Sequence, residues 1–234
     1  MVSQGAEQDG LGEGRLTVAQ LDVILRELEH LPARAAVLAG VLEETGDTDN
    51  DGRTGQVERL KRITELVGSD PATAAKVVSA AVQAGAASIR TITGAVDYLG
   101  ADTIRSAVLT LRAAPPGSDD HDALWRHSLA VALAAEALAG VLGLDASEAW
   151  LCGLLHDVGK AALLHLFPKS YSRVLDSARD DGAGVLELER RIIGADHAVT
   201  GRHLAERWKL PQSCLLYTSP SPRDLSTSRM PSSA

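Results

Sequence analysis

Apolar residues recur every three or four positions along most of the chain, which is the spacing of one face of an α-helix. Thr17 suits the N-cap of a first helix that runs to His30 and carries Leu21, Leu25 and Leu28 on one side. The same spacing predicts further helices over residues 32–44, 56–67, 71–81, 89–99, 102–111, 124–142, 146–156, 168–180, 184–193 and 196–208. No stretch alternates apolar and polar residues over a strand length, so the sequence predicts an all-α fold with no sheet.

Breaks in this pattern divide the chain into parts. Residues 1–14 are rich in glycine and acidic residues and are predicted to be disordered. Residues 15–112 form an N-terminal helical part, and residues 113–123, which contain Pro-Pro-Gly and several aspartates, form a linker. Residues 124–213 form the second helical part.

Helical spacing stops after Pro211, and serine, threonine and proline crowd residues 214–234. The run that begins Cys-Leu-Leu-Tyr-Thr-Ser-Pro-Ser-Pro-Arg-Asp resembles translated sequencing-adaptor read-through. We therefore predict a non-native, disordered tail and a missing native C-terminus. A genuine disordered tail is the alternative that this composition also allows.

Composition limits the classes of function. The net charge is -8, which argues against a general nucleic-acid binder or a protein of anionic membranes, because both need a basic footprint. The longest apolar run, Leu129 to Leu144, is interrupted by Glu136 and is too short to span a bilayer, so it predicts a buried helix. Two cysteines, Cys152 and Cys214, make no disulfide framework, which favours a cytoplasmic location.

The clearest chemical feature is the adjacent pair His156-Asp157, within the run from Gly153 to Lys160. Imidazole and carboxylate groups together suit divalent first-row metals. Neighbours inside a helix point about 100° apart, so the pair needs a turn to face one cation. It lies at a predicted helix end, where Gly159 suits the left-handed C-cap that would supply this turn.

Other segments complete a recognisable series. Trp125-Arg-His127-Ser lies upstream of the pair, and Gly194-Ala-Asp-His197 and Leu204 to Pro211 lie downstream. The N-terminal half adds Leu31-Pro32, Asp70-Pro71 and the run from Ile92 to Gly100. Over residues 20–213 this series resembles the HDOD family, a signalling branch of the HD metal-dependent phosphohydrolase superfamily. The resemblance implies a compact all-α fold of two helical subdomains and a role in bacterial signal transduction, usually without demonstrated catalysis.

The resemblance also supplies a candidate metal site. Catalytic HD relatives hold divalent metal, here expected to be iron or manganese, and hydrolyse phosphoesters. By similarity His127, His156 and Asp157 would be ligands, and His197 resembles a further metal ligand of the HD-GYP phosphodiesterases. Lys160 could hold a phosphate as a point charge. The HD-GYP enzymes also need a His-His pair and an aspartate that would lie beyond Pro211, so the ligand set is incomplete.

Structural alternatives stay open for each of these residues. His127 could cap or hydrogen-bond near a helix start, and His197 follows Asp196 where capping is equally expected. Lys160 could compensate the dipole at a helix C-terminus. The pair itself could be a retained hydrogen-bonded unit.

A second motif, residues 47–58, matches the calcium-loop pattern D-x-[DN]-x-[DN]-G-x5-E. The ligands would be carboxylates and one backbone carbonyl, from Asp47, Asp49, Asp51, Arg53 and Glu58. Thr54 stands where such loops usually carry an apolar residue, and no second copy is present, so an ordinary acidic surface loop is the alternative.

Two functions follow from the sequence. The first is a regulatory, non-catalytic HDOD module that binds a signalling partner protein or a small ligand such as a nucleotide. The alternative is a metal-dependent phosphohydrolase or phosphodiesterase of the HD superfamily, with catalytic candidates His156, Asp157 and Lys160.

Overall fold

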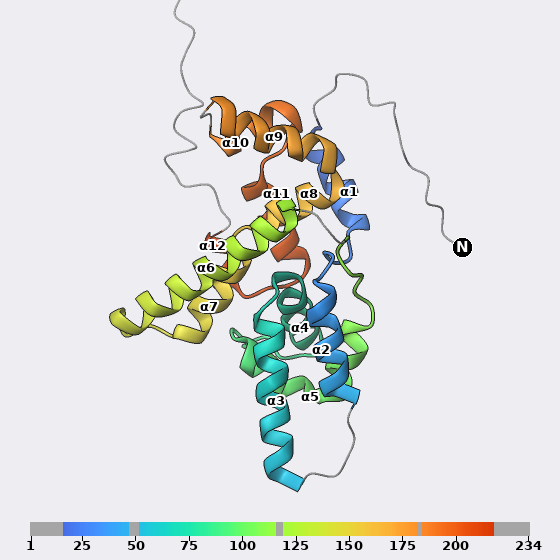
Figure 1. Cartoon of the computed structure of the whole chain (residues 1–234), viewed down its shortest axis with the longest axis vertical. Helices are drawn as coiled ribbons and strands as arrows, with labels where there is room; N and C mark the ends of the chain where they lie inside the picture. Colours follow the sequence, from blue (N-terminus) through green and yellow to red (C-terminus); the bar gives the residue numbers. More distant parts are fainter. Residues whose placement is uncertain (1–15, 47–51, 116–118, 182–183, 218–234) are drawn as a thin grey trace, which may run out of the picture.

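The computed structural model describes residues 16–46, 52–115, 119–181 and 184–217 (Figure 1). These residues form twelve α-helices, and the β-type pairing among them is one isolated parallel bridge between Ala33 and Ala113. The predicted all-α class is confirmed. In the described part of the chain, no helix combines the length and the apolar character that crossing a membrane requires.

Four helices form an N-terminal bundle in which α5 packs against the other three. They are α2 (Ala35–Gly46), α3 (Gly52–Gly68), α4 (Pro71–Gln83) and α5 (Ile92–Val108). Asp70 caps α4 by accepting a hydrogen bond from the Thr73 amide at 2.7 Å. Gly100 has a φ of 70° and kinks α5, so the two helices predicted on either side of Gly100 form one bent element.

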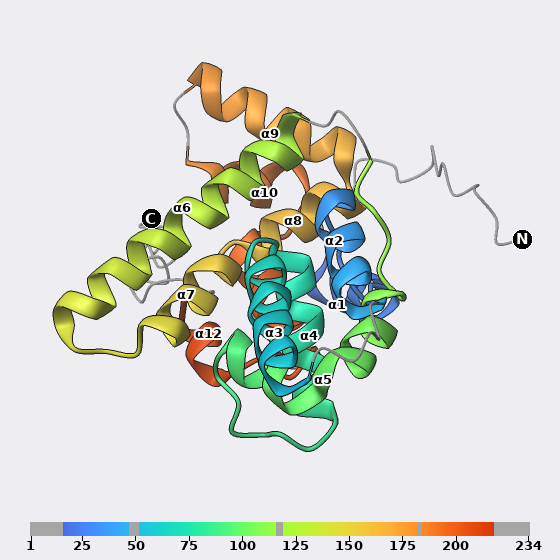
Figure 2. The same cartoon turned by 60° about the horizontal axis from the view of Figure 1, so that its bottom comes forward.

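Seven helices follow and form the C-terminal half. They are α6 (Asp119–Leu142), α7 (Ala146–Leu155), α8 (Val158–Leu166), α9 (Pro168–Asp181), α10 (Val185–Ile192), α11 (His197–Arg207) and α12 (Gln212–Tyr217). The long helix α6 lies along α7, α8 packs against α11, and α9 pairs with α10 (Figure 2). Helix α8 was not predicted, because its residues directly follow the His-Asp pair and carry a glycine near the start.

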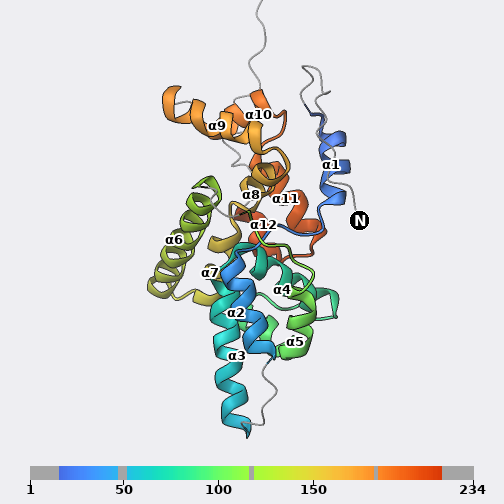
Figure 3. The same cartoon turned by 45° about the vertical axis from the view of Figure 1, so that its right-hand side comes forward.

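Helix α1 (Val18–Glu27) packs against α11 in the C-terminal half, although the sequence grouped it with residues 15–112 (Figure 3). The Leu16 amide donates to the carbonyl of Ile193 at 3.1 Å. The guanidinium of Arg207 donates to the backbone carbonyls of Leu25 and Arg26. Leu16 and helix α1 are therefore held against the C-terminal half by packing and by these hydrogen bonds.

The prediction that Leu129 to Leu144 forms a buried helix is wrong. Large apolar side chains on and just after α6 are exposed, namely Leu133, Leu138, Val141, Leu142 and Leu144. Among the described elements α6 packs chiefly against α7, and its buried residues are the small ones Ser128, Ala132 and Ala139.

The predicted linker, residues 113–123, and the predicted tail, which begins at residue 214, are both partly helical in the structure. Helix α6 begins at Asp119, inside the predicted linker. Helix α12 continues to Tyr217, and Cys214 is buried with its sulfur 3.3 Å from that of Cys152. Residues 1–14 and 218–234 lie outside the described residues, so their predicted disorder and the foreign origin of the tail stay predictions.

Candidate metal centre between α6, α7 and α8

The His156-Asp157 pair forms the whole connection between two helices. Helix α7 ends at Leu155 and α8 begins at Val158. His156 keeps helical torsion angles, and the chain turns at Asp157, where φ is -106° and ψ is 21°. The turn brings the two adjacent side chains to one site.

Gly159 does not make this turn, contrary to the prediction of a left-handed C-cap. It lies in the first turn of α8, where α8 crosses α11 at very short range. A Cβ at Gly159 would stand 1.9 Å from the carbonyl oxygen of His197 and 2.7 Å from the amide nitrogen of Gly201. The glycine is therefore required by the close approach of two backbones, which brings His197 toward the pair.

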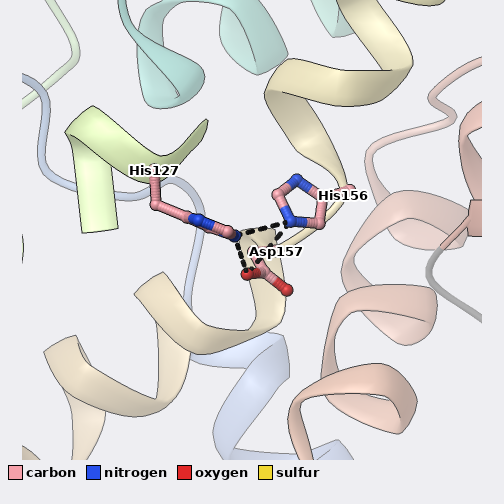
Figure 4. A group of neighbouring side chains, drawn as sticks. All are labelled: His127, His156 and Asp157. Carbon is pink, nitrogen blue, oxygen red and sulfur yellow. Dashed lines mark hydrogen bonds and ion pairs between the residues drawn. The ribbon is translucent and has the colours of Figure 1, made fainter. Parts of the chain in front are cut away.

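Three ligand atoms converge at this turn (Figure 4). Nε2 of His127, from α6, lies 3.2 Å from Oδ2 of Asp157 and 3.2 Å from Nε2 of His156. Nε2 of His156 lies 3.1 Å from the same carboxylate oxygen. All three atoms lie within 4.8 Å of one another, which is the spacing of donors around one cation.

A backbone carbonyl orients His156. Nδ1 of His156 lies 2.8 Å from the carbonyl oxygen of Gly153, one turn earlier in α7. Because a carbonyl oxygen only accepts, Nδ1 carries a proton and Nε2 is turned toward the cluster. Metal-binding histidines are commonly oriented by such a second hydrogen bond.

Asp157 is buried and carries a negative charge. Burial by itself raises the pKa of Asp157, but the hydrogen bond and charge of His156 and the ammonium of Lys160 together hold it well below its usual value. Nζ of Lys160 donates to Oδ2 at 2.7 Å. Lys160 lies in the first turn of α8, so its predicted role at a helix C-terminus is wrong.

His197 lies near the other carboxylate oxygen of Asp157. Its Nε2 lies 4.0 Å from Oδ1 of Asp157. Its Nδ1 lies 2.6 Å from Oε2 of Glu189, and the same oxygen accepts the His197 backbone amide at 2.8 Å. The cap of α11 is Asp196, which accepts from the Val199 amide, so His197 has no capping role.

Glu189 and Tyr171 were not identified from the sequence. Glu189 is fully buried, and its Oε1 accepts a hydrogen bond from the Tyr171 hydroxyl at 2.9 Å. Burial and the neighbouring Glu189 raise the pKa of Tyr171, so the phenol stays protonated and donates. The sequence does indicate that Glu189 is buried, because it lies four residues after Val185 and four before Ile193, on the apolar face of its helix.

The donor set fits a divalent metal. Two imidazole nitrogens and one ionised carboxylate are already assembled, one imidazole is fixed by a carbonyl, and the half-exposed His127 leaves the site accessible. His127 lies well inside α6, which begins at Asp119, and so has no role at a helix start. A metal held there would act as a Lewis acid toward a bound oxygen ligand.

The structure describes only part of the predicted calcium loop. Asp47, Asp49 and Asp51 are among residues 47–51, which are not described. Arg53 and Glu58 lie within the continuous helix α3, where the calcium hypothesis expects an open loop. Glu58 pairs with Lys61 at 3.4 Å, and calcium binding stays a prediction.

Most of the chain matches the model of one protein family. The family model described as HDOD domain matches residues 55–219, well over half of the chain. The chain belongs to the HDOD family. The expected HDOD resemblance and its helical fold are thereby confirmed, and the match covers α3 to α12 and the whole His-Asp cluster.

Solved structures of other proteins share this architecture. A fragment of the MmoQ response regulator from Methylococcus capsulatus is 28% identical, with a TM-score of 0.65 over 80% of this chain and 72% of that one. A virulence factor of Campylobacter jejuni is 16% identical with a TM-score of 0.61 over 86% of this chain and 74% of that one, which shows a shared fold. The HDOD chain described here is thus a module of a fold used in signalling proteins.

Part of the chain is similar in sequence to a curated ribonuclease. Ribonuclease Y of Rhodopirellula baltica is 34% identical over 94 residues, which are 40% of this chain and 16% of that protein. The chain spans less than a fifth of the curated relatives that it matches.

Proposed function

We propose that this HDOD chain is a regulatory, non-catalytic signalling module that transmits a change at the His-Asp cluster to the N-terminal bundle. A role in signalling agrees with the similarity to MmoQ, which is a response regulator. In the proposal the cluster is a polar junction whose state, with or without a bound divalent metal, sets how α6, α7 and α8 sit together.

One observation supports transmission above the others. The indole Nε1 of Trp125, on α6, donates to the carbonyl of Ser69 at 2.8 Å. The indole Nε1 of Trp150, on α7, donates to the carbonyl of Gly68 at 3.1 Å. Both helices that carry the cluster histidines are therefore anchored to the same short connection between α3 and α4.

Hydrogen exchange tests this proposal. Replacing His156→Ala removes one arm of the cluster, and we expect faster exchange both around the α7–α8 turn and in the first turn of α4. The double variant Trp125→Phe with Trp150→Phe keeps the aromatic rings but removes both indole donors, so it should confine the effect of His156→Ala to the C-terminal half.

Two controls make the exchange result specific. His165→Ala removes an exposed histidine of α8 that lies outside the cluster and should leave α4 unchanged. Tyr98→Phe removes a hydrogen bond to Ala84 within the N-terminal bundle and should not mimic the tryptophan variants. Exchange changes that never reach α4 in His156→Ala would contradict transmission.

The second candidate is a metal-dependent phosphohydrolase. It is favoured by three assembled donors with one accessible imidazole, and by the partial similarity to a ribonuclease. Three protein ligands leave coordination positions for water and a phosphoryl oxygen, as hydrolysis needs. Iron or manganese belongs to this proposal, because such a nitrogen and oxygen set suits divalent first-row metals.

A further inference from the structure

A pocket of about 430 Å³ lies between the N-terminal bundle and the cluster-bearing end of the C-terminal half. Its apolar lining comes from both halves, with Pro32, Ala36 and Ala72 on one side and Leu124, Trp125 and Ala161 on the other. Small alanine side chains on both walls leave the space open. The volume lies within the range of small-molecule sites, roughly 300–1,000 Å³.

The charge on one wall of the pocket is already matched. The guanidinium of Arg34 forms an ion pair with Asp122 and lies 4.1 Å from the centre of the Trp125 ring. Both its charge and its flat face are therefore engaged within the protein. A ligand anion would have to share Arg34 with Asp122.

The remaining acidic groups of the lining are matched as well. The buried carboxylate of Asp70 accepts from the amide and hydroxyl of Thr73 and from the Arg34 amide at 3.2 Å. Asp157 holds the ammonium of Lys160. His121 also lines the pocket, and burial lowers the pKa of its imidazole, so it offers no ready counter-charge to an anion. A charged ligand would either disturb one of these contacts or bring an unmatched charge into an apolar space, and both are unfavourable.

The inner end of the pocket is polar. Ser128, which is 3% exposed, and Asp157, which is 6% exposed, both line it. A hydroxyl and a carboxylate are suitable partners for a neutral group that donates a hydrogen bond. Asp157 belongs to the cluster, so an occupant of this end would contact the cluster itself.

We propose that this pocket binds a small neutral molecule with an apolar body and one hydroxyl or amide group. Its apolar body lies between the alanine-lined walls, and its polar group points to Ser128 and Asp157. The binding step is independent of whether the cluster is catalytic, and only the passage from binding to signalling rests on the proposed function.

A matched series of probes tests both the site and the charge rule. Naphthylmethanol, naphthylmethylamine and naphthoate share one apolar body and carry a neutral, a cationic and an anionic group. Titration of the full chain, followed by amide NMR shifts and calorimetry, should show the alcohol binding roughly tenfold more tightly than either charged probe. Its shifts should centre on Trp125 and on Ser128.

Two variants connect the binding to the pocket. Ala36→Phe, at an exposed lining position where the chain has room, should weaken the alcohol roughly tenfold. Ala134→Phe, equally exposed on α6 but outside the lining, should not. Ser128→Ala should remove most of the preference for the alcohol over naphthalene itself.

Several results would overturn the proposal. They are no binding of the alcohol at millimolar concentration, tighter binding of a charged probe, or equal binding to the Ala36→Phe and Ala134→Phe variants. Binding that leaves hydrogen exchange in α4 unchanged would support the pocket and count against transmission. Faster exchange in α4 of His156→Ala, together with no binding of the alcohol, would support transmission and count against the pocket.

Discussion

Nδ1 of His197 lies 2.6 Å from Oε2 of Glu189, a carboxylate with no exposed surface. Because the carboxylate accepts, Nδ1 carries a proton and Nε2 faces Asp157. The contact joins α10 to the start of α11 and gives His197 one orientation toward the cluster. The buried glutamate is therefore a positioning residue for His197 beside the cluster.

Replacing Glu189→Gln should destabilise the fold. The amide of glutamine has the size of the carboxylate, but its NH2 group would face N–H or O–H donors of Tyr171 or His197. An unsatisfied buried hydrogen-bonding group costs about 1–3 kcal/mol. The free energy of unfolding from denaturant titration measures the loss. Glu187→Gln, exposed on the same helix, is the control and should stay within about 0.5 kcal/mol of wild type. Equal stability of the two variants would contradict the positioning role.

Gly159→Ala should strongly destabilise the fold. The added Cβ would collide with the backbone of His197 and Gly201, so α8 and α11 must separate. We expect a loss of about 3 kcal/mol or more, measured by denaturant unfolding. Gly140→Ala in α6 meets no atom within 4 Å and should instead be neutral or stabilise by up to about 1 kcal/mol. Similar effects at the two sites would mean that the helices do not cross so closely.

Several parts of this account could be predicted from the sequence. Apolar spacing predicted most helices, Asp70-Pro71 marked the start of α4, and Gly100 marked the kink in α5. The segment after His156-Asp157 was missed because a single-residue turn between two helices leaves no polar loop in the sequence. Gly159 was given the wrong role for the same reason.

The second side of the site depends on contacts between distant segments. Nothing local to Glu189 or Tyr171 shows that one hydroxyl and one carboxylate meet, since 18 residues separate them. The motif did predict His127, and the structure brings its Nε2 to the His156-Asp157 pair across 29 residues. A family pattern thus predicted the convergence of ligands, whereas their supporting hydrogen bonds required the three-dimensional structure.

Asp70 should make the stability of the protein depend on pH. Burial raises the pKa of Asp70, although hydrogen bonds from Thr73 and Arg34 partly oppose this. The folded protein then keeps this proton to a higher pH than the unfolded chain, so its contribution to stability is present at low pH and falls as pH rises above about 4. Asp70→Asn has no such proton to lose.

Unfolding of wild type and Asp70→Asn between acidic and neutral pH measures this contribution. The free energy of unfolding of the variant minus that of wild type should increase as the pH rises from about 4 toward 7. Asp97→Asn, exposed on α5, controls for the loss of one negative charge. A difference that is constant over this range would show that the buried carboxyl does not titrate as described.

Metal retention should depend on the cluster histidines. Chain purified without chelator and then titrated with Mn²⁺ in a calorimeter should lose at least about tenfold in affinity in His156→Ala, because a ligand with a fixed tautomer is removed. His165→Ala should bind as wild type does. Binding that is insensitive to His156→Ala would mean that the metal sits elsewhere.

Hydrolysis is the most direct test of a regulatory rather than a catalytic role. The chain, loaded in turn with Mn²⁺ and with Fe²⁺, is incubated with bis(p-nitrophenyl) phosphate and with nucleotides and cyclic dinucleotides, alongside His156→Ala and Asp157→Asn. The regulatory account predicts product formation no faster than in the two variants. Metal-dependent product formation by wild type that both substitutions abolish would contradict it and establish the phosphohydrolase.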